Sequence, residues 1–524
     1  MTAGPLTQDY CRFCPGEEQI KISNAICRGR RKTHFPKCRG CVFNDDESGR
    51  EAPRGHDKTQ TCNVIEAVFG QDNICATVPD PLSPEVAWRI GHATAQYLRG
   101  KLRGYERADR SARAIVVSRD TRPHSSLLQQ ALIGGIRSYG VDVIDIGVAD
   151  TLQMRFAVSR IGACGGIQTT AGHMPAAFNG FRFCAAKGIP IGIDTGLASI
   201  RDIAARVPKH DTGVTATVTE TDLSVPYITF ARSVLVGGDK LPRLLKVVVD
   251  ASNGVAGRWL PLVLGRIKNL VVYPMNYQHD GAFSHDPDPS VPRNLKDLRV
   301  SVRQHRADLG VCFDTDLDRC AFIDEKGTIV PSDALAALLA RRLIEREPQA
   351  AVVFDVRATA SLAEEVERAG GVPVRARTDR PSVKKTMAEH NAVLGCDLSG
   401  CFYFRESFFC QSALLAFLHV LNLMATAGRK LSELVRPIQR YRSSGELTFA
   451  CPEPDQTLRK VAAAHQEAQI DDLDGVTVKY PDWWFNLRRE STESALRLIV
   501  QARTKKAVEE RLGELQPFLN SADM

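Results

Sequence analysis

The stretch from Ala307 to Gly327, ADLGVCFDTDLDRCAFIDEKG, is the most informative part of the chain. Apolar residues alternate before Asp314 and resume at Cys320, which predicts two short strands joined by a tight turn. The turn carries Asp314, Asp316 and Asp318. Three neighbouring carboxylates repel one another unless a cation binds them, and hard oxygen ligands favour Mg²⁺ or Ca²⁺. We therefore predict a divalent metal site at this turn.

Two other interpretations of the turn remain open at this point. It fits a solvated acidic turn, in which no metal binds. It also partly fits a helix–loop–helix calcium loop, with Glu325 at the twelfth position. Such a loop needs glycine at its sixth position and helices on both sides, whereas this chain has Arg319 there and strand-like flanks.

Composition limits the class of protein. A chain of 524 residues is too long for one core, and its apolar content of 44% is ordinary for a globular protein. We find no apolar run long enough for a membrane span and no apolar signal core near the start, so we expect a cytoplasmic protein. The net charge of +7 suits an anionic small molecule and does not by itself indicate nucleic acid.

The first 56 residues form a separate cysteine-rich module. Cys11 and Cys14 make one pair, and Cys38 and Cys41 make a second. Two such pairs predict a structural tetrahedral zinc site, which would supply folding energy that so short a segment lacks. An iron–sulfur cluster is the alternative. The module is also a candidate contact site for a protein partner.

Strand and helix patterns alternate over most of the remaining chain, which predicts consecutive α/β units with parallel or mixed sheets. The character changes near residue 436, where a smaller α+β domain begins. The predicted domains are 1–56 (cysteine-rich module), 62–205 (first), 206–328 (second, with the metal turn), 329–435 (third) and 436–524 (fourth).

Two polar loops in the first unit are candidate ligand sites. Arg122 lies in a loop at the carboxyl end of a predicted strand, a common ligand position in α/β folds. The second loop, TTAGHMP from Thr169 to Pro175, contains hydroxyls and His173, and suits phosphate contact or an ordinary turn equally well.

Several motifs agree in order and spacing with one known family. VVSRDTR, DASNGVAG, DGAFSHDPDP, ADLGVCFDTDLDR, VVFDVRATASLAEEVERAGG and DWWFNLRRESTESALRL together resemble the phosphohexomutases, that is, the phosphoglucomutases and phosphomannomutases. The resemblance covers about 62–524 and leaves out the cysteine-rich module.

The resemblance implies an activity and a set of site residues. The family carries a phosphoserine in a Thr-Ala-Ser-His-Asn-Pro loop and passes its phosphoryl group to a sugar monophosphate, with Mg²⁺ beside it. The bisphosphate formed then turns round and returns its other phosphate to the serine. This chain's implied residues are Asp314, Asp316 and Asp318 for Mg²⁺, His173, Arg319 and Lys384 for catalysis, and Arg122, Asp397, Ser399, Arg488 and Thr492 for the substrate.

The chain departs from the family pattern in each substrate loop. Gly172 stands at the phosphoserine position and has no hydroxyl, and neither Thr169 nor Thr170 has any evident positioning for that role. The remaining departures are Cys75 for an arginine, Asp379-Arg380 for a Gly-His pair, Asp397 and Cys401 in the sugar loop, and Glu490 in the phosphate loop, where Arg489 is a candidate to offset its charge.

Three functions are therefore compared. The chain is a divergent mutase (an intramolecular phosphotransferase of the isomerase class), a non-catalytic sugar-phosphate binder, or an interaction protein that uses its cysteine-rich module. We favour weak or absent standard activity, a pseudoenzyme of carbohydrate metabolism, because loss of a covalent nucleophile costs many powers of ten in rate. The choice between gluco and manno sugars stays open.

Overall fold

The structure, a computed structural model, describes residues 64–102, 111–207, 216–490 and 494–519, together with the backbone of 11–13, 21–23 and 110. The chain divides into two compact units, Met1–Val64 and Ile65–Met524. In the first unit, β1 (Cys11–Phe13) pairs antiparallel with β2 (Lys21–Ser23). The side chain of Cys11 and the residues Cys14, Cys38 and Cys41 lie outside the described part, so the zinc site stays a prediction.

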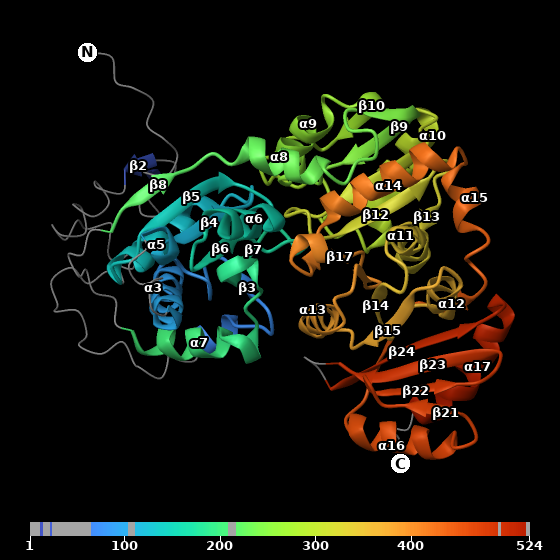
Figure 1. Cartoon of the computed structure of the whole chain (residues 1–524). Coiled ribbons are helices and arrows are strands. Elements are labelled where there is room, and N and C mark those ends of the chain that lie inside the picture. The colour runs from blue at the N-terminus through green and yellow to red at the C-terminus, as the bar shows by residue number, and fades with distance from the viewer. Residues whose placement is uncertain are drawn as a thin grey trace. The chain divides into compact units, whose positions relative to one another are not determined.

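The first α/β domain has a mixed sheet in the order β3-β7-β6-β4-β5-β8 (Figure 1). Strands β4, β5, β6 and β8 run parallel to one another, whereas β7 runs antiparallel to both of its neighbours, β6 and β3. The helix that follows Ser83 is capped by the side chain of that residue, which accepts from the Val86 N–H at 3.3 Å. The elements are β3 (Ile74–Thr77), α3 (Pro84–Lys101), α4 (Arg110–Arg113), β4 (Ile115–Arg119), α5 (Ser125–Ser138), β5 (Val143–Val148), α6 (Thr151–Ile161), β6 (Gly165–Thr169), β7 (Phe178–Ala185), α7 (Leu197–Arg206) and β8 (Val218–Glu220).

The second and third domains share one sheet plan. The orders are β10-β9-β11-β12-β13 and β15-β14-β16-β17-β18. In each sheet the first three strands are parallel, and the fourth strand runs antiparallel to both of its neighbours. The second domain comprises α8 (Ser224–Arg232), β9 (Lys240–Asp250), α9 (Ala256–Leu264), β10 (Lys268–Met275), α10 (Lys296–Gln304), β11 (Leu309–Phe313), β12 (Cys320–Asp324) and β13 (Ile329–Val330). The third comprises α11 (Ser332–Arg346), β14 (Ala351–Asp355), α12 (Ala360–Arg368), β15 (Val372–Ala376), α13 (Arg380–Glu389), β16 (Leu394–Cys396), β17 (Phe402–Phe404), β18 (Cys410–Gln411), α14 (Ala413–Ala427) and α15 (Leu431–Val435).

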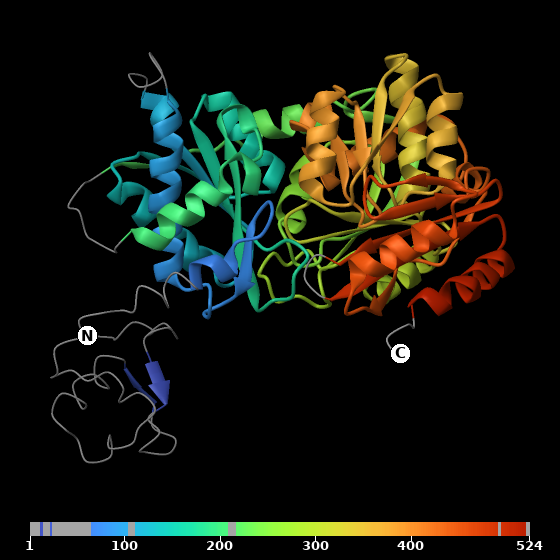
Figure 2. The same ribbon diagram turned by 90° about the horizontal axis from the view of Figure 1, so that it is seen from below.

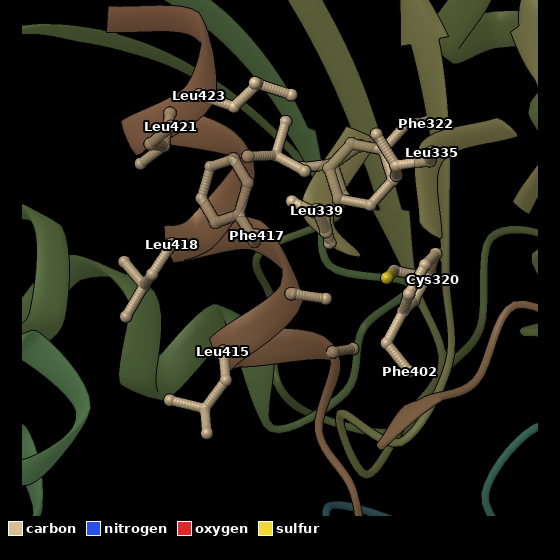
Figure 3. Packing of buried hydrophobic residues seen from close by; sticks show 14 of the residues in the cluster. Cys320, Phe322, Leu335, Leu339, Phe402, Leu415, Phe417, Leu418, Leu421 and Leu423 are labelled. Atoms are coloured by element: carbon tan, nitrogen blue, oxygen red, sulfur yellow. The ribbon is translucent and has the colours of Figure 1, made fainter. Parts of the chain in front are cut away.

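Helix α14 joins these two domains through a common apolar core. Its residues from Ala413 to Ala425 are all buried, as expected of a helix that is apolar on every side. Figure 3 shows Phe417 of this helix beside Leu339 of α11, and Phe322 of β12 belongs to the same apolar cluster. The Ala413 N–H also donates to the Leu317 carbonyl at 2.8 Å. The start of α14 is thereby attached directly to the aspartate turn.

The C-terminal domain is an antiparallel sheet with two helices on one face. Strands β19-β24-β23-β22-β21 follow in that order, and β20 pairs with β24. Helices α16 and α17 pack on the face that carries Trp483 and Phe485 (Figure 2). The elements are β19 (Arg442–Ser443), β20 (Leu447–Ala450), α16 (Pro454–Ala464), β21 (Gln469–Asp471), β22 (Val476–Lys479), β23 (Trp483–Arg489), β24 (Ala495–Ala502) and α17 (Lys505–Leu519).

This architecture confirms the predicted three α/β domains with mixed sheets, followed by a smaller α+β domain. Of the helices in the parts of the chain given above, none is long and apolar enough to cross a membrane.

Candidate active site

The turn between β11 and β12 is buried, which rules out a solvated acidic turn. Asp314, Asp316 and Asp318 are at most 1% exposed. One oxygen of Asp314 accepts hydrogen bonds from the Asp318 and Arg319 N–H groups at 2.9 and 3.0 Å, which closes the turn. Leu317 adopts a left-handed φ of 59° to complete it. The flanking strands are antiparallel, so the predicted strand–turn–strand is confirmed.

The turn is short of positive charge. Each aspartate keeps one buried oxygen without a hydrogen-bond partner: Oδ2 of Asp314, Oδ1 of Asp316 and Oδ1 of Asp318. Burial raises the pKa of Asp314 well above its ordinary value, and the charges of Asp316 and Asp318 raise it further. Buried carboxylate oxygens of this kind normally have a partner, so the donor set suits a hard divalent cation.

Arg182 of β7 supplies part of the missing charge. Its Nη2 lies 3.0 Å from Asp316 Oδ2, and its Nη1 contacts Asp318 Oδ2. Gln411 Nε2 donates to the same Asp318 oxygen at 2.9 Å. Although burial lowers the pKa of Arg182, Asp316 and Asp318 raise it above its ordinary value. Within the described residues, a divalent ion at this turn would therefore share these carboxylates with a guanidinium.

A different group of side chains brings its donor atoms closest together. In the described parts of the chain, Asp250, His285 and Cys312 are the three metal-ligand-type residues whose donor atoms all lie within 4.8 Å of one another. His285 Nε2 is 3.1 Å from Asp250 Oδ2 and its Nδ1 is 2.8 Å from the Asp286 carbonyl. The hydrogen bond to Asp250 raises the pKa of His285. Because His285 already uses both ring nitrogens in hydrogen bonds to oxygen atoms, neither nitrogen is left to bind a metal ion.

Gly172 faces the aspartate turn. A Cβ placed on it would lie 3.2 Å from both carboxylate oxygens of Asp316 and 2.9 Å from Arg182 Nη2. Its φ of 57° is left-handed, a conformation that glycine adopts without cost. The Thr315 hydroxyl donates to the Gly172 carbonyl at 2.7 Å and ties the two loops together. A side chain at position 172 would therefore point at the predicted metal ligands.

Thr170 is held in place, contrary to our expectation from the sequence. Its hydroxyl lies 2.8 Å from Asp120 Oδ2 and 3.1 Å from Asp316 Oδ2. The Gly172 N–H donates to the same hydroxyl oxygen at 3.1 Å. Burial raises the pKa of Asp120. Thr169 differs, because its buried hydroxyl has no hydrogen-bond partner in the described structure.

Arg122 organises the loop from Gly172 to Phe178. Its guanidinium donates to the carbonyls of Gly172, Met174, Pro175 and Phe178 at 2.6–3.0 Å. Its Nε lies 3.3 Å from Asp120, and the side chain is fully buried. These contacts do not support the prediction that Arg122 binds the substrate, because its donors are directed at the backbone.

His173 and Arg319 keep buried polar atoms without partners. Burial moves the pKa of His173 far below its ordinary value, and the charges of Arg319 and Arg380 lower it further, so the imidazole is neutral. His173 Nδ1 and Arg319 Nε have no hydrogen-bond partner in the residues described. Arg319 Nη1 lies 3.6 Å from Asp288. Both groups therefore retain capacity for a ligand.

Lys384 is paired with a carboxylate that sequence reasoning missed. Its Nζ lies 3.5 Å from Asp72 Oδ2, and Arg380 Nε lies 4.0 Å from the same oxygen. Burial raises the pKa of Asp72, but Arg380 and Lys384 outweigh it and hold that pKa far below its usual range. Burial also lowers the pKa of Lys384. Asp72 precedes β3, so this contact joins the first domain to α13 of the third.

The predicted sugar loop is closed on itself. Asp397 Oδ1 accepts from the Ser399 N–H at 2.9 Å and from the Ser399 hydroxyl, and Asp397 Oδ2 accepts from the Tyr403 hydroxyl at 2.9 Å. Asp397 is only 4% exposed. The structure thus does not support the prediction that Asp397 and Ser399 read sugar hydroxyls, since each satisfies the other.

Arg488 of β23 is also paired internally. Its Nη2 contacts Glu446 Oε1, and the other oxygen of Glu446 lies 3.0 Å from Arg497 Nη1. Glu490 contacts Arg497, so Arg497 rather than Arg489 offsets its charge. Arg489 instead lies 3.6 Å from Asp455. Thr492 falls outside the described residues.

The sequence offered no signal for several of these partners. Arg182 sits in an ordinary strand pattern, and Asp72, Gln411, Glu446 and Arg497 belong to no motif. Only Thr170 lay in a loop that the sequence had singled out. Each is brought to the site by a contact between distant segments.

The chain matches known protein families over much of its length. Three domains described as phosphoglucomutase/phosphomannomutase α/β/α domains I, II and III match residues 66–211, 226–327 and 331–441. A phosphomannomutase of Salmonella montevideo is 33% identical over 465 residues, covering 86% of this chain and 99% of the relative.

Solved structures show the same fold. A phosphoglucomutase/phosphomannomutase family protein of Burkholderia thailandensis is 27% identical with a TM-score of 0.78, covering 87% of this chain and 98% of that one. An Aspergillus fumigatus N-acetylphosphoglucosamine mutase, solved with GlcNAc-6P and magnesium, is 13% identical with a TM-score of 0.56 over 89% of this chain and 99% of its own, which shows the fold alone. From the matched domains and the near-complete overlap with curated relatives, the chain belongs to the phosphoglucomutase/phosphomannomutase family.

Proposed function

We propose that this chain binds a hexose phosphate, or a similar anionic sugar, together with Mg²⁺, and that it forms no phosphoenzyme at position 172. The observation that carries the proposal is the placement of Gly172. A side chain there would point at Asp316, yet glycine provides no hydroxyl to accept a phosphoryl group. Standard mutase turnover is therefore weak or absent.

The cation would be held by Asp314, Asp316 and Asp318. Each offers a buried oxygen without a partner, and the aspartate turn has the hard oxygen donors that Mg²⁺ prefers. Such an ion would offset the charge of a bound phosphoryl group. Arg182 already contacts two of these carboxylates, so the proposal requires its guanidinium to shift as the ion enters.

The anion would meet groups that keep unused polar atoms. Arg319 provides a fixed positive charge and an Nε without a partner. His173 is neutral and has a ring nitrogen free to donate or accept a hydrogen bond. The Lys384 side chain is 8% exposed and paired with Asp72, so we assign it the role of joining the first domain to the third rather than that of a sugar contact.

Calorimetric titration of the full chain with glucose 1-phosphate and mannose 1-phosphate, with and without Mg²⁺, tests this function. We expect binding that requires Mg²⁺ and is lost in Asp316→Asn. A coupled assay with a trace of the 1,6-bisphosphate should give little 6-phosphate. Turnover at an ordinary mutase rate would overturn the non-catalytic part, and absence of any binding would overturn the whole proposal.

A second candidate function is mutase activity through Thr170. Its hydroxyl lies between Asp120, a buried carboxylate able to take its proton, and Asp316 of the aspartate turn. In this route Asp120 takes the proton of the Thr170 hydroxyl, a bond forms from Thr170 Oγ1 to phosphorus as the phosphorus–oxygen bond to the sugar breaks, and that proton is passed on to the departing sugar oxygen. Mapping of covalent phosphate by mass spectrometry after incubation with glucose 1,6-bisphosphate separates the two candidates, with Thr170→Val as the control.

For the cysteine-rich module we propose a structural zinc site that supports contact with a protein partner. The support is the spacing of Cys11, Cys14, Cys38 and Cys41. Zinc per chain should fall by one in Cys11→Ser/Cys14→Ser. Zero zinc in reduced protein prepared without chelator would contradict this site.

A further inference from the structure

A cavity of about 200 Å³ lies between the third and fourth domains. The third domain lines it with the end of β14 and the first turn of α12, and the fourth domain with β22 and the beginning of β23. Tyr441, in the segment that links the two domains, also lines it. An apolar cavity of about 150 Å³ is large enough to bind benzene. This cavity therefore has room for a single aromatic ring with a small substituent.

The cavity lies outside the candidate active site. Trp484, which lines it, stands near the beginning of β23, whereas Arg488 stands near the end. The four residues from Trp484 to Arg488, at about 3.3 Å each, span about 13 Å along the strand. Of the described residues that line the cavity, none is among those predicted from the sequence to bind metal, phosphate or sugar. A molecule in this cavity would therefore occupy a separate site.

Aromatic side chains form fixed walls of the cavity. The Tyr441 hydroxyl donates to Glu364 Oε1 at 2.6 Å. Tyr480 stacks on Trp483, with the ring centroids 4.8 Å apart and the ring planes inclined by 6°. Trp484 is buried and lines the cavity as well. Because these rings are already held in place, the protein would lose little side-chain freedom when a flat ligand binds.

Lys479 brings a positive charge to the cavity. Its side chain makes no hydrogen bond or ion pair with the residues that the structure describes. Burial and the charge of Arg375 lower the pKa of Lys479, although Asp471 partly opposes this effect. Arg375 is itself paired with Asp471. The Lys479 ammonium is therefore the charge at this cavity that lacks a direct partner within the described residues.

The acidic residue of the lining does not balance that charge. Asp482 is exposed to solvent. Glu514 chiefly, and Asp482 to a lesser degree, raise the pKa of Arg511, so the field of Asp482 is shared with a cation of α17. Aromatic walls with one unpaired ammonium suit a flat ligand that carries one negative charge.

We propose that this cavity is a second ligand site, which binds a small aromatic monocarboxylate. The carboxylate accepts hydrogen bonds from Lys479 Nζ, and the ring packs against Tyr441 and Trp484. Because such a ligand contacts both domains, it also stabilises the contact between the third domain and the fourth. The inference goes beyond the proposed function and does not depend on sugar-phosphate binding.

Calorimetry on the full chain tests the inference with benzoate and its neutral analogue, benzamide. We expect one benzoate per chain, and benzamide should bind about tenfold more weakly or worse, because it lacks the charge that pairs with Lys479. Lys479→Met should weaken benzoate binding about tenfold or more and leave benzamide within about twofold. Trp484→Leu should weaken both ligands, and it serves as the test if Lys479→Met does not fold.

Lys506→Met is the matched control, because Lys506 is an exposed lysine of α17 in the same domain, 3.6 Å from Glu510. It should leave both affinities unchanged, and saturating glucose 1-phosphate with Mg²⁺ should leave benzoate binding unchanged. Absence of benzoate binding, equal affinities for benzoate and benzamide, an unchanged benzoate affinity in Lys479→Met, or displacement of benzoate by glucose 1-phosphate would overturn the inference. If glucose 1-phosphate itself does not bind, the proposed function fails, while the benzoate affinities of the variants still decide this inference.

Discussion

Returning a hydroxyl to position 172 is the sharpest test of the site. In Gly172→Ser the new side chain points at Asp316, since the Cβ lies 3.2 Å from both of its oxygens. The nearest atom is Arg182 Nη2 at 2.9 Å, the far end of a flexible side chain that can move aside. The left-handed φ of 57° costs an L-residue about 1–2 kcal/mol. We expect Gly172→Ser to fold, with an unfolding free energy lower by about that amount.

Covalent phosphorylation and mutase turnover should distinguish Gly172→Ser from its matched control, Gly172→Ala. Gly172→Ala carries the same Cβ and the same backbone cost, so its stability should equal that of Gly172→Ser. After incubation with glucose 1,6-bisphosphate and Mg²⁺, only Gly172→Ser should carry a covalent phosphate, mapped to residue 172 by mass spectrometry. Its mutase turnover should exceed that of the alanine variant about tenfold or more, a difference of about 1.4 kcal/mol in transition-state stabilisation.

Two results would refute this reasoning. Equal, negligible phosphorylation of the serine and alanine variants would show that residue 172 does not face the reacting phosphate. Covalent phosphate on Thr170 of the wild-type chain would show that the chain keeps its chemistry through another hydroxyl.

Three further predictions concern the surrounding network. The wild-type chain should gain about 2.7 kcal/mol of stability at a Mg²⁺ concentration one hundred times the Kd. Asp314→Asn should gain none, as measured by thermal unfolding. Equal gains in the two proteins would contradict a metal site at the aspartate turn. Burial, with Asp318 and Asp316, raises the pKa of Asp150 from 3.8 to about 7, so its folded state holds a proton and its contribution to stability is lost as pH rises from about 4 through 7. In Asp150→Asn the free energy of unfolding, measured by denaturant titration, should differ less between pH 5 and pH 8 than in the wild-type chain. An unchanged difference would mean that other groups cause the loss. Arg122→Lys should cost about 3 kcal/mol or more, because most of the hydrogen bonds to four carbonyls are lost; a cost below about 1 kcal/mol would mean that the loop does not depend on them.

The sequence predicted the parts of this protein that are encoded locally. The strand–turn–strand around Asp314 could be predicted because hydrophobic periodicity depends on near neighbours along the chain. The order and spacing of the motifs predicted the family. The sequence also showed that position 172, where the family has its phosphoserine, is a glycine without a hydroxyl.

What each charged side chain does was decided by the tertiary structure. Arg122 and Asp397 looked like ligand contacts, but the fold turns their polar atoms to loop carbonyls and to Ser399 and Tyr403. Arg182 and Glu446 belong to ordinary strand patterns, yet Arg182 contacts Asp316 of the aspartate turn and Glu446 contacts Arg488. Ion pairs act over a few ångströms of space whatever the separation along the chain, so their partners follow from packing between domains and not from any local pattern.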